Sequence, residues 1–93
     1  MTTAIIIHEV QDGEVWARAW QRGKGSRHEM FGKLGIKCRT FRDPNNPNVT
    51  GIMAEIPDVT KFQDLLQSDE GQTAMREDGL KVETMRMLFE FTP

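Results

Sequence analysis

The six residues from Asp43 to Asn48, near the middle of the chain, are two prolines, three asparagines and one aspartate. Proline fixes φ and lacks an amide proton, while asparagine and aspartate favour turns, so this segment interrupts any helix or strand. Before it, residues 36–42 alternate in character with the two-residue period of a strand, and after it residues 49–56 form a second, mainly apolar stretch. The centre of the chain therefore predicts an antiparallel β-hairpin.

Two further strands are predicted near the ends of the chain. Residues 4–10 are mostly β-branched and apolar, and Asp12-Gly13 follows them, which indicates a buried strand. In residues 82–91, Met85, Met87, Phe89 and Phe91 alternate along one face, while Leu88 lies on the other. This last strand has apolar side chains on both faces and so needs cover on both sides.

The segments between these strands have helical spacing. A long first helix is expected from the cap Asp12 to Gly35, with a kink or a loosened turn at residues 23–26 because Gly23 and Gly25 each disfavour a helix interior. Its apolar face is formed by Val15, Trp16, Ala19, Trp20, Met30, Phe31 and Leu34.

A second helical region follows the hairpin. Thr60 and Gln63 have capping-box spacing, and Ser68 resembles a fresh helix start, so this region is expected to form two pieces that end at Gly79.

This order, β-α-β-β-α-β, is that of a ferredoxin-like α+β fold in which two helices cover one face of a four-stranded antiparallel sheet. Residues 1–93 form one domain. The other sheet face is left bare, and the alternation of Ile5 and Ile7 with Ile6 predicts that the bare face is apolar. We therefore expect a homodimer that packs sheet against sheet.

Composition excludes several classes of protein. Charged residues are 28% of the chain with a net charge of −2 and no dense Lys/Arg run, so no nucleic-acid partner is expected and an RNA-binding ferredoxin-like domain is the weaker interpretation. Cys38 is the only cysteine, which rules out an intramolecular disulfide and favours a reducing cytoplasm. The first apolar run, residues 4–7, is too short for a signal peptide or a membrane span.

Several local strings resemble the dimeric α/β-barrel superfamily, especially its small members related to antibiotic-biosynthesis monooxygenases. The strings are His8-Glu9-Val10, Asp12 with Trp16 and Trp20, residues 41–48, Phe62 with Leu66-Gln67-Ser68, and Met75-Arg76. The resemblance covers nearly the whole chain and implies two sheets packed face to face, with a ligand pocket in each protomer between its own sheet and helices. Superfamily members include cofactor-free monooxygenases, haem-degrading enzymes, isomerases and sensors, so the fold leaves the function open.

The two histidines are the candidate catalytic residues. His8 lies on a mainly apolar strand and is able to act as a base near neutral pH, or to serve as a hydrogen-bonded core histidine. His28 lies on the less regular half of the first helix, where it either reaches the same pocket or faces water. Neighbouring residues on a strand point to opposite faces, so His8 and Glu9 do not form a metal site, and neither a metal nor a cofactor is expected.

Four other residues are candidates for ligand binding. Trp16 and Trp20 share one helix face and are suited to line a pocket for a flat aromatic molecule, or simply to fill the core. Arg39 and Phe41 share one face of their strand, where an arginine is able to pair with an anionic substrate group or with Glu55.

Three hypotheses follow for the function. The first is a homodimeric small-molecule-binding protein with its pocket between sheet and helices. The second is a cofactor-independent monooxygenase that acts on an aromatic or polyketide-like substrate, with His8 or His28 as the base. The third is a structural or interaction module whose bare sheet face serves a partner and whose helix-sheet space is completely filled.

Overall fold

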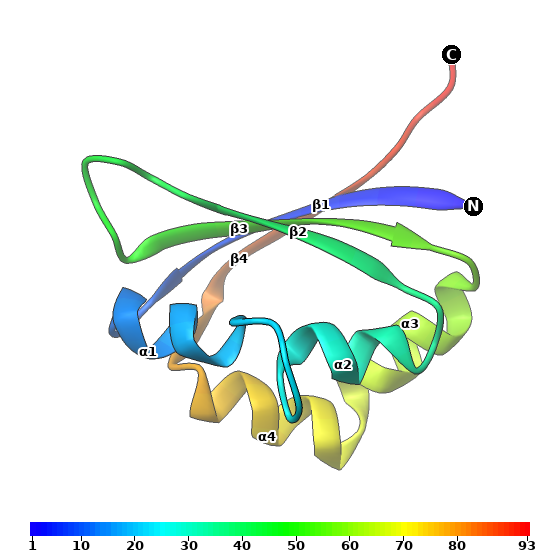
Figure 1. Ribbon diagram of the computed structural model, residues 1–93. Helices are drawn as coiled ribbons and strands as arrows, with labels where there is room; N and C mark the ends of the chain where they lie inside the picture. Colours follow the sequence, from blue (N-terminus) through cyan, green and yellow to red (C-terminus); the bar gives the residue numbers. More distant parts are fainter.

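The computed structural model describes all residues 1–93 and has all four helices on one face of a single sheet (Figure 1). The elements in chain order are β1 (Thr2–Val10), α1 (Gly13–Ala19), α2 (Arg27–Gly32), β2 (Lys37–Arg42), β3 (Val49–Ile56), α3 (Val59–Gln67), α4 (Asp69–Glu77) and β4 (Leu80–Phe89). The longest helices have nine residues, and none is long and apolar enough to cross a bilayer.

The sheet has the strand order β2-β3-β1-β4, and every neighbouring pair is antiparallel. β2 and β3 form the predicted hairpin, with Asp43–Asn48 as its connection. Asp43 Oδ1 accepts hydrogen bonds from the backbone N–H groups of Asn45 and Asn46, which is how an aspartate favours this turn. The ferredoxin-like fold predicted from the sequence is confirmed.

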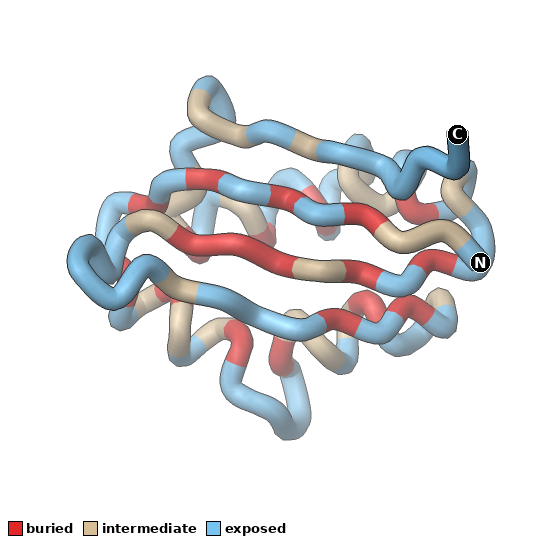
Figure 2. Tube along the Cα trace, turned by 90° about the horizontal axis from the view of Figure 1, so that it is seen from above, coloured by how far each residue is buried: buried red, intermediate tan, exposed pale blue.

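The core lies between the sheet and the helices. Along β1, buried and exposed residues alternate because successive side chains point to opposite faces (Figure 2). Buried side chains from the two central strands meet buried aromatic side chains from the helices. The set comprises Ala4, Ile6, Val10, Ile52, Ala54, Ile56, Trp16, Trp20, Phe31 and Phe62.

The opposite face of the sheet is open and partly apolar. Ile5 is 42% exposed, Ile7 45%, Phe41 47% and Leu88 56%. Ile5 is the cross-strand partner of Leu88 on β4 and of Met53 on β3, so these side chains form a contiguous patch. We call this surface the open face.

The prediction of one long first helix is wrong. The chain forms two short helices, and the segment between them turns at Gly23 and Gly25, whose φ angles are +138° and +80°. Such angles suit glycine and end the helix instead of kinking it. Ser26 then caps α2, because its Oγ accepts a hydrogen bond of 3.2 Å from Glu29 N–H.

The second helical region forms the two predicted pieces. Ser68 Oγ accepts a hydrogen bond from Gly71 N–H and so caps α4, as expected. The predicted start of the first piece at Thr60 is wrong, because Asp58 is the cap and accepts a hydrogen bond of 3.1 Å from Lys61 N–H. An aspartate placed just before the helix competes successfully with the threonine two residues later.

Candidate functional site

His8 is placed by β1, the second strand from one edge of the sheet, with its side chain toward the helices and only 3% of the residue exposed. Its cross-strand partner is Thr50 on β3, which is also buried. Thr50 Oγ1 lies 2.6 Å from His8 Nδ1 and donates a 3.1 Å hydrogen bond to the carbonyl oxygen of His8. One hydroxyl thus ties the imidazole to its own backbone.

This arrangement couples the tautomer of the ring to the Thr50 hydroxyl. A hydroxyl has one proton: when Thr50 Oγ1 donates it to the carbonyl, Oγ1 accepts a hydrogen bond from Nδ1–H of His8, and when Oγ1 donates it to Nδ1, the ring proton is on Nε2. In the first tautomer Nε2 is the nitrogen that carries a lone pair. Burial lowers the pKa of His8, although its own backbone carbonyl opposes this, so the ring is neutral at pH 7. Neutral His8 has the form of a general base.

The sheet is irregular beside His8. Ile7 pairs with Arg86 and Glu9 pairs with Lys81, so four residues of β4, 82–85, stand opposite His8 alone. Thr84 Oγ1 accepts a hydrogen bond of 2.9 Å from Glu9 N–H, which replaces a lost ladder bond. Bulges of this kind re-aim side chains and are common next to active sites.

Trp16 lies on α1 and Trp20 is the residue that caps its C-terminal end; at the other end, Asp12 Oδ1 caps the helix by accepting a 2.9 Å hydrogen bond from Glu14 N–H. The ring centroids of His8 and Trp16 are 6.1 Å apart in an edge-to-face arrangement, and those of Trp16 and Trp20 are also 6.1 Å apart. The indole Nε1–H of Trp16 is buried and has no hydrogen-bond partner. A buried donor without a partner costs about 1–3 kcal/mol, so this group is ready for an acceptor.

These side chains line a cavity of about 50 Å³ between the sheet and the helices. Its wall is mainly apolar, and His8, Arg27 and Asp78 are its charged or titratable groups. Four of the chain's six methionines also line it, namely Met30, Met75, Met85 and Met87.

Arg27 and Asp78 form a buried ion pair beside the cavity, with side chains 15% and 8% exposed. Arg27 Nη2 donates a 2.8 Å hydrogen bond to Asp78 Oδ1, and its Nε contacts both carboxylate oxygens at 3.1 Å. Hydrogen bonding to Asp78 raises the pKa of Arg27, whereas burial raises the pKa of Asp78 although Arg27 opposes this. The pair joins the start of α2 to the end of α4.

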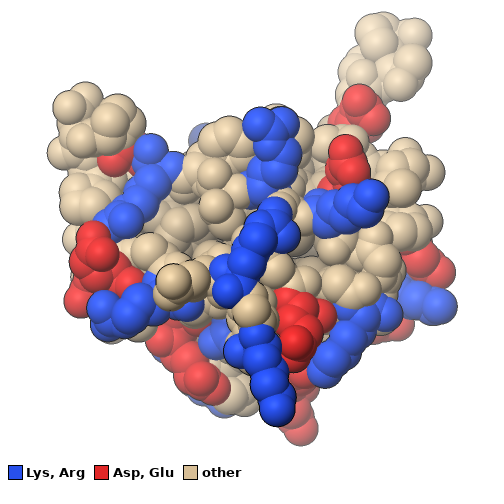
Figure 3. Space-filling model, viewed as in Figure 1, with Lys and Arg blue, Asp and Glu red and all other residues tan.

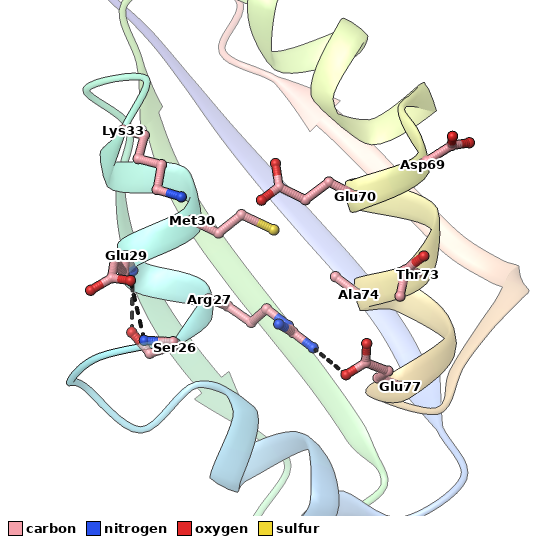
Figure 4. A pocket seen from close by; sticks show the side chains of 11 residues that line it. Ser26, Arg27, Glu29, Met30, Lys33, Asp69, Glu70, Thr73, Ala74 and Glu77 are labelled. Carbon is pink, nitrogen blue, oxygen red and sulfur yellow. Dashed lines mark hydrogen bonds and ion pairs between the residues drawn. The ribbon is translucent and has the colours of Figure 1, made fainter.

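A second hollow, of about 350 Å³, lies outside this ion pair between α2 and α4. Figure 4 shows Arg27 reaching from α2 toward Glu77 on α4, with Met30 and Ala74 facing each other across the hollow. Arg27, Met30 and Ala74 line both spaces, so they form the wall between the cavity and the outer hollow.

The structure brings together three of the six residues that the sequence singled out. His8, Trp16 and Trp20 all line the cavity. His28 lies behind Trp20, with ring centroids 5.2 Å apart, and does not line the cavity. Burial and the positive charge of Arg22 lower the pKa of His28.

Arg39 and Phe41 lie on the open face, away from the cavity. The reason is strand parity: Cys38, which precedes Arg39, points toward the helices and is 6% exposed, so Arg39 and, two residues later, Phe41 point the other way. The guanidinium of Arg39 lies 5.8 Å from the ring centroid of Phe41. Burial raises the pKa of the Cys38 thiol to about 11, so this cysteine is unreactive.

Sequence reasoning missed Thr50, Arg27 and Asp78. Thr50 is recognised only from the register that pairs β1 with β3, which is a contact between residues 42 positions apart. Arg27 and Asp78 are 51 positions apart, and each has the sequence surroundings of an ordinary surface residue. No local signal identified them.

Comparison with known proteins supports the fold. No protein-family profile and no curated protein matches the sequence. An antibiotic biosynthesis monooxygenase structure superposes with a TM-score of 0.71 at 10% identity, covering 100% of this chain and 99% of the other. For a putative antibiotic biosynthesis monooxygenase from Nitrosomonas europaea the TM-score is 0.70 at 11% identity, with 99% and 98% covered.

A third structure, SnoaB, a cofactor-independent oxygenase from Streptomyces nogalater, has a TM-score of 0.58 at 15% identity, covering 99% of this chain and 91% of the other. At such identities the likeness establishes the fold. The chain therefore has the ferredoxin-like fold of antibiotic biosynthesis monooxygenase structures, and the fold resemblance inferred from local strings is confirmed.

Proposed function

We propose that this chain is a homodimeric small-molecule-binding protein, working in a reducing compartment such as the cytoplasm, whose ligand is a flat aromatic molecule held between the sheet and the helices. The observation that carries the proposal is the indole N–H of Trp16, which is buried without a partner in a cavity wall. Natural proteins rarely leave such donors unpaired. A ligand carbonyl or phenolate oxygen supplies the missing acceptor.

The cavity must enlarge to hold such a ligand. Its volume is about 50 Å³, whereas pockets for drug-sized ligands typically measure about 300–1,000 Å³. Methionine is unbranched and changes rotamer easily, so the four methionines in the wall are able to move aside. The outer hollow beyond Met30 and Ala74 offers the space into which the wall moves.

The open face supports the homodimer. Ile5, Ile7, Phe41 and Leu88 leave it apolar, and a 93-residue domain gains stability from a further buried surface. Leu88→Arg is expected to reduce the mass of the particle from twice 10.7 kDa to 10.7 kDa in light scattering. Thr60→Arg, an equal charge added on exposed α3, is the control. A wild-type particle with the mass of a monomer would refute the proposed homodimer.

Calorimetric titration with xanthone, a neutral tricyclic ketone, tests the binding site. Trp16→Phe keeps an aromatic ring but removes the donor, so we expect the Kd for xanthone to rise about tenfold. Trp20→Phe is the matched control because the Trp20 indole N–H is not a buried, unpaired donor, and its Kd should stay within about threefold. Equal losses in both variants would show that Trp16 acts only through its ring.

A second candidate function is a cofactor-independent oxygenase, and the geometry of His8 favours it. With Nδ1–H held by Thr50, Nε2 is free to remove a proton from a bound, acidic aromatic substrate. The resulting carbanion reduces O₂, and the indole N–H of Trp16 stabilises the substrate oxyanion. For anthrone the balance is one O₂ consumed, with anthraquinone and one water formed.

Oxygen uptake with anthrone separates binding from catalysis. The enzyme hypothesis predicts uptake above the spontaneous rate with no added metal or flavin, and a fall of about 10²–10⁴-fold in the catalysed rate for His8→Gln. His28→Gln, a substitution outside the cavity, should keep the rate within about threefold. Oxygen uptake equal to the spontaneous rate would refute the oxygenase hypothesis and leave the binding function.

A further inference from the structure

His28 and Arg39, two of the sequence-predicted residues that lie outside the cavity, line another hollow, separate from the one between α2 and α4. This is a hollow of about 520 Å³ around the outer edge of β2, lined by His28 of α2 on one side and by Arg39 on the side of the open face. Arg22 and Lys37 also line it, and Glu55 is its only carboxylate. We call this hollow, together with the neighbouring one described next, the basic groove.

The basic groove continues around the loop between α1 and α2. A hollow of about 350 Å³ there is lined by Arg18, Arg22 and Lys24 and has no acidic side chain. Arg22 belongs to both hollows, so the two adjoin. Figure 3 shows Lys and Arg side chains following one another down the face that carries β2 and α2 in this view.

The charge of this surface opposes that of the rest of the chain. The two hollows are lined by five of the 12 basic side chains and by one of the 14 acidic ones, although the chain has a net charge of −2. The seven basic and thirteen acidic residues elsewhere make the remainder strongly negative. Such a concentration of one sign in a hollow attracts and retains oppositely charged molecules.

The cations of the basic groove form no ion pair within the chain. The ion pairs of the structure involve Arg27 and Arg42 alone, and neither belongs to the groove. Lys37 and Glu55 are cross-strand neighbours, yet they form no ion pair. Five unpaired cations around one groove repel each other, and an anion relieves that repulsion.

The floor of the groove is apolar. Ile36 and buried Cys38 line the larger hollow on the side of α2, and Met53 lines it on the side of the open face. Cys38 is not the reactive group there, because its thiol has a pKa of about 11. An apolar floor under a cationic rim suits a molecule with both an apolar part and an anionic group.

We propose that the basic groove is a second binding site, which takes a small organic anion whose phosphate or carboxylate group lies among Arg22, Lys37 and Arg39 and whose apolar part lies on Ile36. The site is separate from the cavity, from which Trp20 and His28 divide it. Its existence does not depend on the ligand proposed for the cavity.

Titration of ¹⁵N-labelled protein with phenyl phosphate, followed by NMR in low salt, tests this site. We expect saturable shifts at the backbone amides of Arg22, His28 and Lys37, with a Kd on the order of 0.1–1 mM. Inorganic phosphate should bind at least about threefold more weakly because it lacks the apolar part. Affinity should fall as salt is raised from about 20 to 200 mM.

The double variant Arg22→Gln/Lys37→Gln should weaken phenyl phosphate binding at least tenfold, since it removes two of the charge-assisted contacts. Lys61→Gln/Arg76→Gln makes the same change in charge on α3 and α4 and should leave the Kd within about twofold. Equal weakening in both variants, or no saturable shift, would overturn the site. If Arg22→Gln/Lys37→Gln changed the mass of the particle and left the affinity for phenyl phosphate unchanged, the site would also be refuted, because these cations would then form a contact between subunits.

Discussion

Thr50→Val tests the hydrogen bonding assigned to the His8 ring by replacing one hydroxyl with a methyl group. The substitution keeps the shape of the side chain and its β-branch, and it removes the hydroxyl that contacts His8 Nδ1 at 2.6 Å and the His8 carbonyl at 3.1 Å. Both His8 and Thr50 are at most 3% exposed, so water does not replace the lost hydroxyl. Leaving buried polar groups unpaired costs about 1–3 kcal/mol.

We therefore expect Thr50→Val to lower the free energy of unfolding by about 2 kcal/mol, which corresponds to a fall in Tm of about 8–16 °C for a domain of this size. Thr40→Val is the matched control, because Thr40 lies on the adjacent strand but is exposed. Its effect should stay within about 0.5 kcal/mol. Thermal and urea unfolding give both values, and equal stability of Thr50→Val and wild type would refute the hydroxyl bridge and the ring orientation derived from it.

Three further substitutions test other parts of the structure. The pKa of His8 is lower in the folded than in the unfolded chain, so the unfolded chain binds the proton first as pH falls. The free energy of unfolding of the wild type should therefore decrease as pH falls through about 6.5. Urea unfolding at about pH 7.5 and 5.5 should show a smaller decrease for His8→Gln. Arg27→Met leaves Asp78 buried without its partner and should cost about 3–5 kcal/mol in the same assay at pH 7, so a cost below 1 kcal/mol would exclude a buried pair. Gly71→Ala places a methyl group against the backbone of the α3–α4 junction and should cost about 1–3 kcal/mol of stability. In Gly32→Ala the added methyl group meets nothing within 4 Å, so this variant should be stabilised by up to about 1 kcal/mol. Equal Tm values for the two variants would contradict the close packing at Gly71.

The strands were predictable from sequence because their evidence is local. The turn at residues 43–48 combines prolines and asparagines, and the stretch 49–56 matches β3 residue for residue. The last strand was placed two residues too late, because its regular alternation is interrupted by the bulge opposite His8. A bulge depends on how two strands pair, which a single strand's sequence does not reveal.

The helices were less predictable, and the reason is a competition between periodicity and backbone freedom. The apolar spacing from Val15 to Leu34 continues across the break, because both α1 and α2 pack on the same sheet face. Gly23 and Gly25 nevertheless adopt positive φ and divide the segment. Periodicity therefore reported the buried face correctly but not the continuity of the helix.

The candidate site was predictable in part for a similar reason. The spacing of Trp16 and Trp20 places both on one helix face, and strand parity places His8 with Ile6 toward the helices. The same parity rule leaves open which face is covered, so Arg39 and Phe41 were associated with a pocket that lies on the other side of the sheet. Thr50 required the strand register, which is a long-range property.

The indole N–H resonance of Trp16 in an ¹H–¹⁵N spectrum tests the central claim most directly, since the chain has only two tryptophans and assignment needs one variant. We predict that xanthone moves the Trp16 indole proton downfield, as a new hydrogen bond to the ketone forms, with smaller changes at the Trp20 indole. Saturable binding of xanthone that leaves the Trp16 indole resonance in place, with shifts confined to the open face, would contradict a ligand site between the sheet and the helices.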